Sequence, residues 1–283
     1  MNALSAVLMG VLQGIAEFLP ISSSGHLALF QHFFHVENYE DTQMFFTVLL
    51  HLGTLISVFV YYWKDVLEMI REFFALVGSL FRRNERRYGA QAVPPARRLV
   101  LLIIVATLPL FLVLPVKDKV EGAMANPRFV SVMLILTGFI LFFSDRMARG
   151  RKTERNATMV DALLVGVAQG FGTLPGISRA GSTISAGMLR GFDRAFAVRF
   201  SFLMSLPAVL GANILSVADV IRDGGVDLSL MPLYLLGTVV AAVVGYFAIR
   251  LVHALADKGK FGAFAYYCWA MGLISLIAGF LIP

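Results

Sequence analysis

Of the 283 residues, 58% are hydrophobic and 15% charged, a composition too apolar for a water-soluble domain, which predicts an integral membrane protein in the lipid bilayer. The net charge of +6 comes from Lys and Arg residues that cluster between apolar runs, as the positive-inside bias of membrane proteins requires, so we predict no nucleic-acid binding. The single cysteine, Cys268, excludes an intrachain disulfide framework.

Six apolar runs are long enough to cross a bilayer as helices. They are residues 42–63, 99–116, 129–144, 196–217, 231–252 and 261–282. The sequence therefore predicts an all-α polytopic membrane protein with about six transmembrane helices, in a single integral membrane domain over residues 1–283.

Two further apolar segments are shorter and end at prolines. They are residues 1–19, before Pro20, and residues 159–174, before Pro175, and short apolar pieces follow at 27–36 and 183–189. Interrupted helices at matching places in two halves of a chain are typical of re-entrant helix-loop-helix elements, because irregular backbone at membrane depth is tolerated only inside protein or beside water. We predict two such elements.

The two interrupted segments also resemble each other in sequence. At an offset of 156, Gly10-Val11, Gln13-Gly14, Ile21-Ser22 and Gly25 recur as Gly166-Val167, Gln169-Gly170, Ile177-Ser178 and Gly181. A second block, residues 46–52, matches residues 200–206 at an offset of 154. We therefore predict two repeats, over approximately residues 1–145 and 156–283.

The connections at 64–98 and 146–155 hold eight and five Lys or Arg residues, respectively. Such basic connections are expected in the cytoplasm. Alternation of the spans then places the 117–128 loop outside, so the first helix pair enters from the outer face and the second from the inner face. The two repeats are accordingly expected to be inverted.

The first motif runs from Gln13 to His26. Glu17 follows Gln13 by four residues, so both side chains lie on one helix face. A carboxylate at mid-membrane costs roughly 2.5–3.5 kcal/mol and therefore needs a partner or a water cavity. The pair could share a divalent cation or orient a water molecule, and the structural alternative is a protonated Glu17 that bonds a neighbouring helix.

Hydroxyls and one imidazole follow in the run Ser22-Ser23-Ser24-Gly25-His26. Free backbone N–H groups and hydroxyls at the start of a helix bind anions. Ser23 and Ser24 are candidate nucleophiles or phosphate contacts, although a Ser here is more often a helix N-cap. His26 lies in the Gly-Ser loop and could act as a general acid, a base or a nucleophile, whereas His51, inside a span, is interpreted as structural.

The second motif, residues 175–183, repeats this arrangement and adds Arg179. A guanidinium at membrane depth needs a carboxylate or a phosphate, and its planar fork suits phosphate oxygens. A structural Arg179–Glu17 ion pair is the alternative, and both interpretations hold if the pair also frames the substrate.

Both motifs resemble those of a known family. QGIAEFLPISSSGH fits an (E/Q)xxxE pattern followed by a Ser-rich Gly-His turn, and PGISRAGST is similar to PGxSRSxxT, of the bacterial undecaprenyl-diphosphatase (bacitracin-resistance) family. The resemblance implies a multi-pass enzyme of the bacterial inner membrane that removes the terminal phosphate of undecaprenyl diphosphate, recycling the lipid carrier for cell-wall synthesis, with the site open to the periplasm.

The resemblance also implies roles for individual residues. It implies a Mg²⁺ or Ca²⁺ site at Gln13 and Glu17, catalytic roles for Glu17, Ser23, His26 and Arg179, and substrate contacts at Ser22, Ser24, Gly25, Gly176, Ser178 and Thr183. Two positions depart from the pattern: Gln13 stands where Glu is common, and Ala180 where Ser is usual. Spacing does not decide between Ser23 and His26 as the nucleophile.

The expected partners are a polyprenyl diphosphate lipid and the bilayer, and the sequence leaves the oligomeric state open, a homo-oligomer included. The rival function belongs to another class. Inverted repeats with broken helices are also typical of secondary transporters, so a polyprenyl-phosphate flippase or an anion transporter is the alternative.

Overall fold

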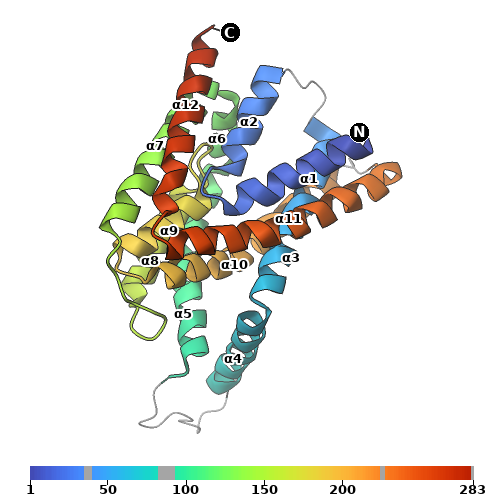
Figure 1. Cartoon of the computed structure of the whole chain (residues 1–283). Helices are drawn as coiled ribbons and strands as arrows, with labels where there is room; N and C mark the ends of the chain where they lie inside the picture. Colours follow the sequence, from blue (N-terminus) through green and yellow to red (C-terminus); the bar gives the residue numbers. More distant parts are fainter. Residues whose placement is uncertain (35–39, 82–92, 224–226, 282–283) are drawn as a thin grey trace.

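The computed structural model describes residues 1–34, 40–81, 93–223 and 227–281 (Figure 1). In these residues the regular structure is helical and contains no strand, which confirms the all-α prediction. The α-helices are α1 (Ala3–Phe18), α2 (Ser23–Phe34), α3 (Glu40–Tyr61), α4 (Trp63–Phe81), α5 (Pro95–Thr107), α6 (Lys117–Gly122), α7 (Pro127–Met147), α8 (Met159–Phe171), α9 (Arg179–Leu189), α10 (Arg194–Asp223), α11 (Met231–Asp257) and α12 (Phe264–Leu281). Short 3-10 helices are η1 (Leu108–Leu112), η2 (Leu114–Val116), η3 (Ala123–Ala125), η4 (Leu228–Leu230) and η5 (Phe261–Ala263).

Five helical stretches of the described chain are long and apolar enough to cross a membrane. They are Pro95–Val116, Pro127–Met147, Arg194–Ala218, Leu228–Asp257 and Phe261–Leu281. They coincide with five of the six predicted spans and confirm a polytopic membrane protein.

The remaining predicted span, 42–63, corresponds to helix α3 and ends at a bend in the chain. Helix α3 qualifies as a span only together with α4, and the two helices meet at an 89° bend next to Tyr62. The charged residues Lys64 and Asp65 follow directly after the bend. The apolar run ends there, so the chain turns instead of continuing along the same axis.

Both predicted helix-loop-helix pairs are present, as α1–α2 and α8–α9, but their second helices begin earlier than predicted. Helix α2 begins at Ser23 instead of 27, and α9 at Arg179 instead of 183. The physical reason is capping: Ser22 Oγ accepts a hydrogen bond from the Gly25 N–H at 3.2 Å, and Ser178 Oγ accepts one from the Gly181 N–H at 3.1 Å. The motif residues from Ser23 and from Arg179 onward thus lie on first helical turns and not in loops.

Matched glycines let each helix pair approach a long helix of the other half. A Cβ added at Gly10 of α1 would lie 2.5 Å from the Gly237 oxygen of α11, and one at Gly166 of α8 would lie 2.2 Å from the Ala106 oxygen of α5. Only glycine fits at such distances. Helix α1 therefore packs along α11, as Figure 1 shows for the blue and orange helices, and α8 packs along α5.

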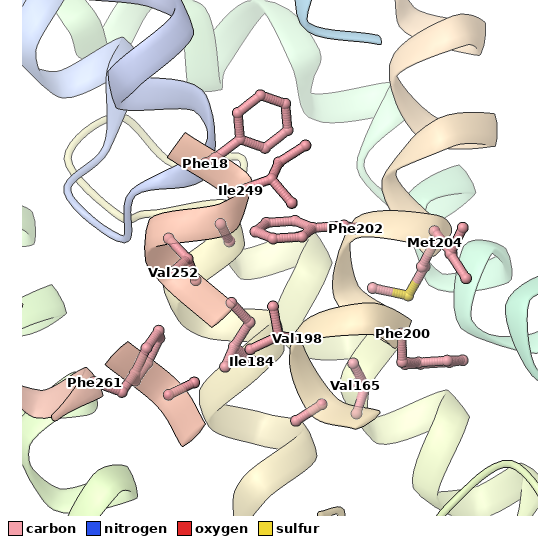
Figure 2. Close-up of a cluster of buried hydrophobic side chains, with 14 of the residues drawn as sticks. Phe18, Val165, Ile184, Val198, Phe200, Phe202, Met204, Ile249, Val252 and Phe261 are labelled. Carbon is pink, nitrogen blue, oxygen red and sulfur yellow. The ribbon is translucent and has the colours of Figure 1, made fainter. Parts of the chain in front are cut away.

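The other long helices also pack against one another in pairs. Helix α3 packs on α11, α10 on α5, α3 on α10, and α7 on α12. Figure 2 shows the apolar cluster where α1, α9, α10 and α11 meet, with Phe18, Phe202 and Ile249 side by side. The Phe18 and Phe202 rings meet edge to face, with centroids 5.4 Å apart. Because Phe18 follows Glu17 in the chain, this cluster anchors the carboxylate described next.

Candidate active site

Glu17 is the centre of the polar site. Its side chain, in the last turn of α1, is 6% exposed. One carboxylate oxygen, Oε1, is paired with Arg179 Nη2 of α9. The other, Oε2, accepts hydrogen bonds from Gln13 Nε2 at 3.1 Å and Ser23 Oγ at 3.3 Å. The structure therefore brings together residues of both motifs around one buried carboxylate.

Local backbone geometry places Ser23 over this carboxylate. Helix α1 ends at Phe18, and Ser22 adopts a positive φ of 68°, which turns the chain back. A positive φ is uncommon outside glycine, and such conformations concentrate at functional sites. The first turn of α2, which begins with Ser23, consequently faces the end of α1.

His51 of α3 is a site residue that the sequence analysis interpreted as structural. Its Nε2 atom lies 3.8 Å from Glu17 Oε2. Its Nδ1 atom lies 2.9 Å from the Thr47 carbonyl oxygen and donates to it. One signal was available in the sequence: the second repeat block aligns His51 with Ser205, which also lines the site.

His26 faces a different neighbour. Its Nδ1 atom lies 2.8 Å from the Ser22 carbonyl oxygen, and its Nε2 atom lies 2.8 Å from the Tyr267 hydroxyl of α12. The two rings stack with centroids 5.5 Å apart. Both ring nitrogens of His26 thus have hydrogen-bond partners. Its catalytic role stays a prediction, and it would require the hydrogen bond between His26 Nε2 and the Tyr267 hydroxyl to break.

The hydroxyls predicted to contact phosphate divide into different roles. Ser22 and Ser178 are buried, and their hydroxyls cap α2 and α9. Thr183 Oγ1 is buried and hydrogen-bonded to Ser201 Oγ at 2.5 Å. Ser24 Oγ is half-buried and lies 3.5 Å from Ser22 Oγ. Of the three consecutive serines, Ser23 is the one whose hydroxyl bonds the carboxylate.

The two loops touch through their glycines. A Cβ added at Gly25 would lie 2.8 Å from the Gly176 Cα atom, and Gly176 itself has a φ of +92°, which favours glycine. The Gly176 carbonyl oxygen accepts a hydrogen bond from Thr137 Oγ1 of α7 at 2.9 Å. The predicted role of both glycines in substrate binding is untested, but their close contact sets the spacing of the two helix starts.

A small cavity of about 10 Å³ is lined in part by Glu17 and Arg179. Polar side chains from α8, α9 and α10 line it together with that pair: Gln169, Thr183, Ser201 and Ser205. Gln169 is fully buried, and in the described part of the chain neither of its amide atoms has a hydrogen-bond partner. A volume of this size accommodates about one water molecule. Gln169, the repeat counterpart of Gln13, had no predicted role.

The donor atoms at Glu17 suit a hard divalent cation in part. Within the described residues, no three His, Cys, Asp or Glu side chains are grouped so that they could hold a metal ion. Gln13 and Glu17 nevertheless supply one amide and one carboxylate, and Oε2 lies on the side away from Arg179. Mg²⁺ is commonly bound by one or two carboxylates, with substrate phosphates and waters as its other ligands, and this donor set fits that mode.

An apolar pocket of about 890 Å³ lies between α3, α4, α5 and α10. Leu55 in its wall follows His51 by one helical turn, and Leu206 is adjacent to Ser205. The pocket wall therefore continues to within one turn of the polar site, which is the arrangement an amphiphilic ligand requires.

Comparison with known proteins agrees with both motifs. The chain matches the family model described as bacitracin resistance protein BacA over residues 6–274. It is 37% identical to the undecaprenyl-diphosphatase of Methanosphaera stadtmanae, with 98% of each chain covered. It is 39% identical to that of Alkaliphilus metalliredigens, with 98% of each covered, and 41% identical to that of Syntrophotalea carbinolica, with 96% and 97% covered. The chain belongs to the bacitracin resistance protein BacA family.

Proposed function

We propose that the protein is a membrane phosphatase that hydrolyses undecaprenyl diphosphate to undecaprenyl phosphate and inorganic phosphate, which recycles the lipid carrier for cell-wall synthesis and confers bacitracin resistance. The observation that carries this proposal is the convergence of a buried carboxylate, a guanidinium and a hydroxyl that donates to the carboxylate, from Glu17, Arg179 and Ser23. The family match and the relatives, which are named undecaprenyl-diphosphatase, support it.

The diphosphate binds where α2 and α9 begin. Helix N-termini carry partial positive charge and free N–H groups that attract phosphate. Arg179 is the first residue of α9 and is 27% exposed, so its guanidinium can reach both Glu17 and an incoming phosphate. The guanidinium can thereby bind phosphate oxygens while it stays paired with Glu17.

The chemical step is in-line displacement at the terminal phosphorus. Ser23 Oγ attacks, its proton passes to Glu17 Oε2 at 3.3 Å, and the phosphoanhydride bond breaks as undecaprenyl phosphate leaves. Water then cleaves the phosphoserine, releasing inorganic phosphate and regenerating Ser23. Arg179 stabilises the charge on the transferring phosphoryl group throughout. A divalent cation, Mg²⁺ or Ca²⁺, held by Gln13 and Glu17 would supply further charge neutralisation.

The prenyl chain lies in the apolar pocket between α3, α4, α5 and α10. The pocket wall is apolar apart from Thr107, whose hydroxyl already bonds the Ile103 carbonyl at 2.8 Å. The position of Leu55 and Leu206 within one helical turn of His51 and Ser205 supports one ligand that reaches both regions.

The protein resides in the bacterial inner membrane with its polar site open to the periplasm. Arg199 supports the placement of both basic connections on one side of the membrane, because it lies 2.5 Å from Asp65 Oδ1 and 3.6 Å from Glu154 Oε2. Those residues belong to the two basic connections, at 64–98 and 146–155, whose described parts therefore meet at one end of the molecule. The basic residues within 82–92 lie outside the described residues.

The two halves are inverted repeats whose helix pairs are re-entrant. Matching cap bonds at Ser22 and Ser178 support the repeat, as do the matching close approaches at Gly10 and Gly166. Helix α1 of the first half packs on α11 of the second half, and α8 of the second half packs on α5 of the first half. This reciprocal packing is what two related halves are expected to show.

Phosphate release from undecaprenyl diphosphate by the purified, detergent-solubilised protein tests the proposed function. Wild type should release phosphate, and Glu17→Gln should abolish release while circular dichroism shows that the helices remain. Movement of a labelled prenyl phosphate across vesicles without phosphate release would contradict the proposal and support the transporter alternative.

A further inference from the structure

The imidazole ring of His51 is hydrogen-bonded in a way that is typical of a metal ligand. Its Nδ1–H donates to the Thr47 carbonyl at 2.9 Å, so in the neutral ring Nε2 carries the lone pair. Metal-binding histidines characteristically donate their other ring N–H to a backbone carbonyl or a carboxylate, which orients the ring. Nε2 therefore faces the site as a ready electron-pair donor.

The second observation is what Nε2 faces. Nε2 lies 3.8 Å from Glu17 Oε2, which is too long for a hydrogen bond. Two acceptor atoms thus face each other across a gap. Two ligands that each lie about 2.1 Å from one cation can be up to about 4.2 Å apart, so the gap accommodates a shared cation.

Two further side chains that could bind a metal ion lie close to Glu17 Oε2. Ser23 Oγ lies 3.3 Å from Oε2, and Gln13 Nε2 lies 3.1 Å from it. A half-turn of the Gln13 amide exchanges its nitrogen for its oxygen and presents a neutral ligand. The side of Glu17 away from Arg179 is therefore lined by donors from α1, α2 and α3.

We propose that His51 Nε2 is a ligand of the divalent cation, together with Glu17 Oε2 and the Gln13 amide oxygen, and that substrate phosphate and water complete the coordination. This inference rests on the proposed function, since it refines the cation site of the diphosphatase. With Gln13 neutral, Glu17 is the one carboxylate of the set.

The ligand set determines which metal the site prefers. Imidazole nitrogen suits transition metals, and carboxylate and amide oxygens suit Mg²⁺, Ca²⁺ and Mn²⁺. A mixed set accordingly favours Mn²⁺ over Ca²⁺, which takes oxygen ligands. The alternative is a protonated His51 that forms an ion pair with Glu17 and binds no metal.

The test measures bound Mn²⁺ directly by pulsed electron paramagnetic resonance on the purified full-length protein in detergent. Wild type should show ¹⁴N coupling to Mn²⁺. His51→Gln should lose the coupling and weaken Mn²⁺ binding about tenfold or more. His26→Gln is the matched control and should keep both, because both nitrogens of His26 already have partners.

A further variant guards against misfolding. His51→Asp supplies an oxygen ligand and should bind Mn²⁺ without ¹⁴N coupling. Coupling that is absent in wild type, persists in His51→Gln or disappears in His26→Gln would overturn the assignment. Phosphate release is scored separately: a wild type that releases phosphate without ¹⁴N coupling overturns the role of His51 alone, whereas one that couples to Mn²⁺ but releases no phosphate overturns the proposed function.

Discussion

At the residue scale, Glu17 divides its two oxygens between different tasks. Oε1 compensates the guanidinium of Arg179, and Oε2 faces Ser23, Gln13 and His51. A buried carboxylate is stable when it is paired and hydrogen-bonded, and both conditions hold here. Oε1 therefore balances the charge of Arg179, and Oε2 is left for the proposed proton transfer and metal binding.

The proposed nucleophile can be tested against its neighbour. Ser23→Ala removes the hydroxyl that bonds Glu17, and it should lower kcat for phosphate release by about a hundredfold or more. Ser24→Ala, whose hydroxyl lies 3.5 Å from Ser22 Oγ, should stay within about threefold of wild type. Steady-state kinetics on undecaprenyl diphosphate make the comparison, and equal losses in both variants would reject Ser23 as the nucleophile.

Arg179→Lys tests the geometry of the guanidinium rather than its charge. Lysine keeps the positive charge but loses the planar fork that holds phosphate oxygens in pairs. We expect kcat/KM to fall about 100- to 1000-fold, the usual effect of removing one donor to a developing charge. A variant with unchanged kcat/KM would show that Arg179 contributes charge alone.

At the element scale, each helix pair depends on close backbone contact with a long helix. Gly10 and Gly166, which match at an offset of 156 residues, permit similar close contacts, with α11 and α5. These contacts set the depth of α1 and α8, and hence the positions of Glu17 and Arg179. In a bilayer, where lipid is as apolar as the helices, such close packing is a main source of helix association.

Adding one methyl group at these positions should loosen the fold. Gly10→Ala and Gly166→Ala should each destabilise the protein by about 1–3 kcal/mol through overpacking. Gly211→Ala in α10 is the control, because an added Cβ meets nothing within 4 Å, and it should be neutral or slightly stabilising. Thermal unfolding in detergent reports the difference, and equal Tm values in all three variants would contradict the packing argument.

At the scale of the whole molecule, two helices link the apolar pocket to the polar site: Leu55 follows His51 by one turn of α3, and Leu206 follows Ser205 in α10. The bilayer is as apolar as the pocket, so the hydrophobic effect does not drive the prenyl chain into it. The pocket instead orients the chain so that the diphosphate meets Arg179 in a productive position.

Filling the pocket should therefore affect long substrates selectively. Ile70→Trp, in the pocket wall, should lower kcat/KM for undecaprenyl diphosphate about three- to tenfold relative to a ten-carbon prenyl diphosphate. Ile274→Trp on α12, exposed and outside the pocket, is the control and should leave the ratio unchanged. Equal loss for both substrates in Ile70→Trp would indicate a structural effect instead.

Several features followed from sequence alone because their causes are local or compositional. Apolar length predicts the spans, prolines mark the ends of α1 and the loop before α9, and a charged pair inside an apolar chain must find partners. Glu17 and Arg179 could thus be singled out, and their pairing was among the alternatives considered.

Only the tertiary structure decided which other side chains reach that pair. His51 and Gln169 look like any polar residue in a span, and their roles depend on α3 meeting α1 and on α8 lying behind α9. The close contact of Gly25 with Gly176 likewise depends on two loops that are far apart in the sequence. Local patterns specify helices and buried charges, whereas contacts between distant helices are set by packing, which no single segment encodes.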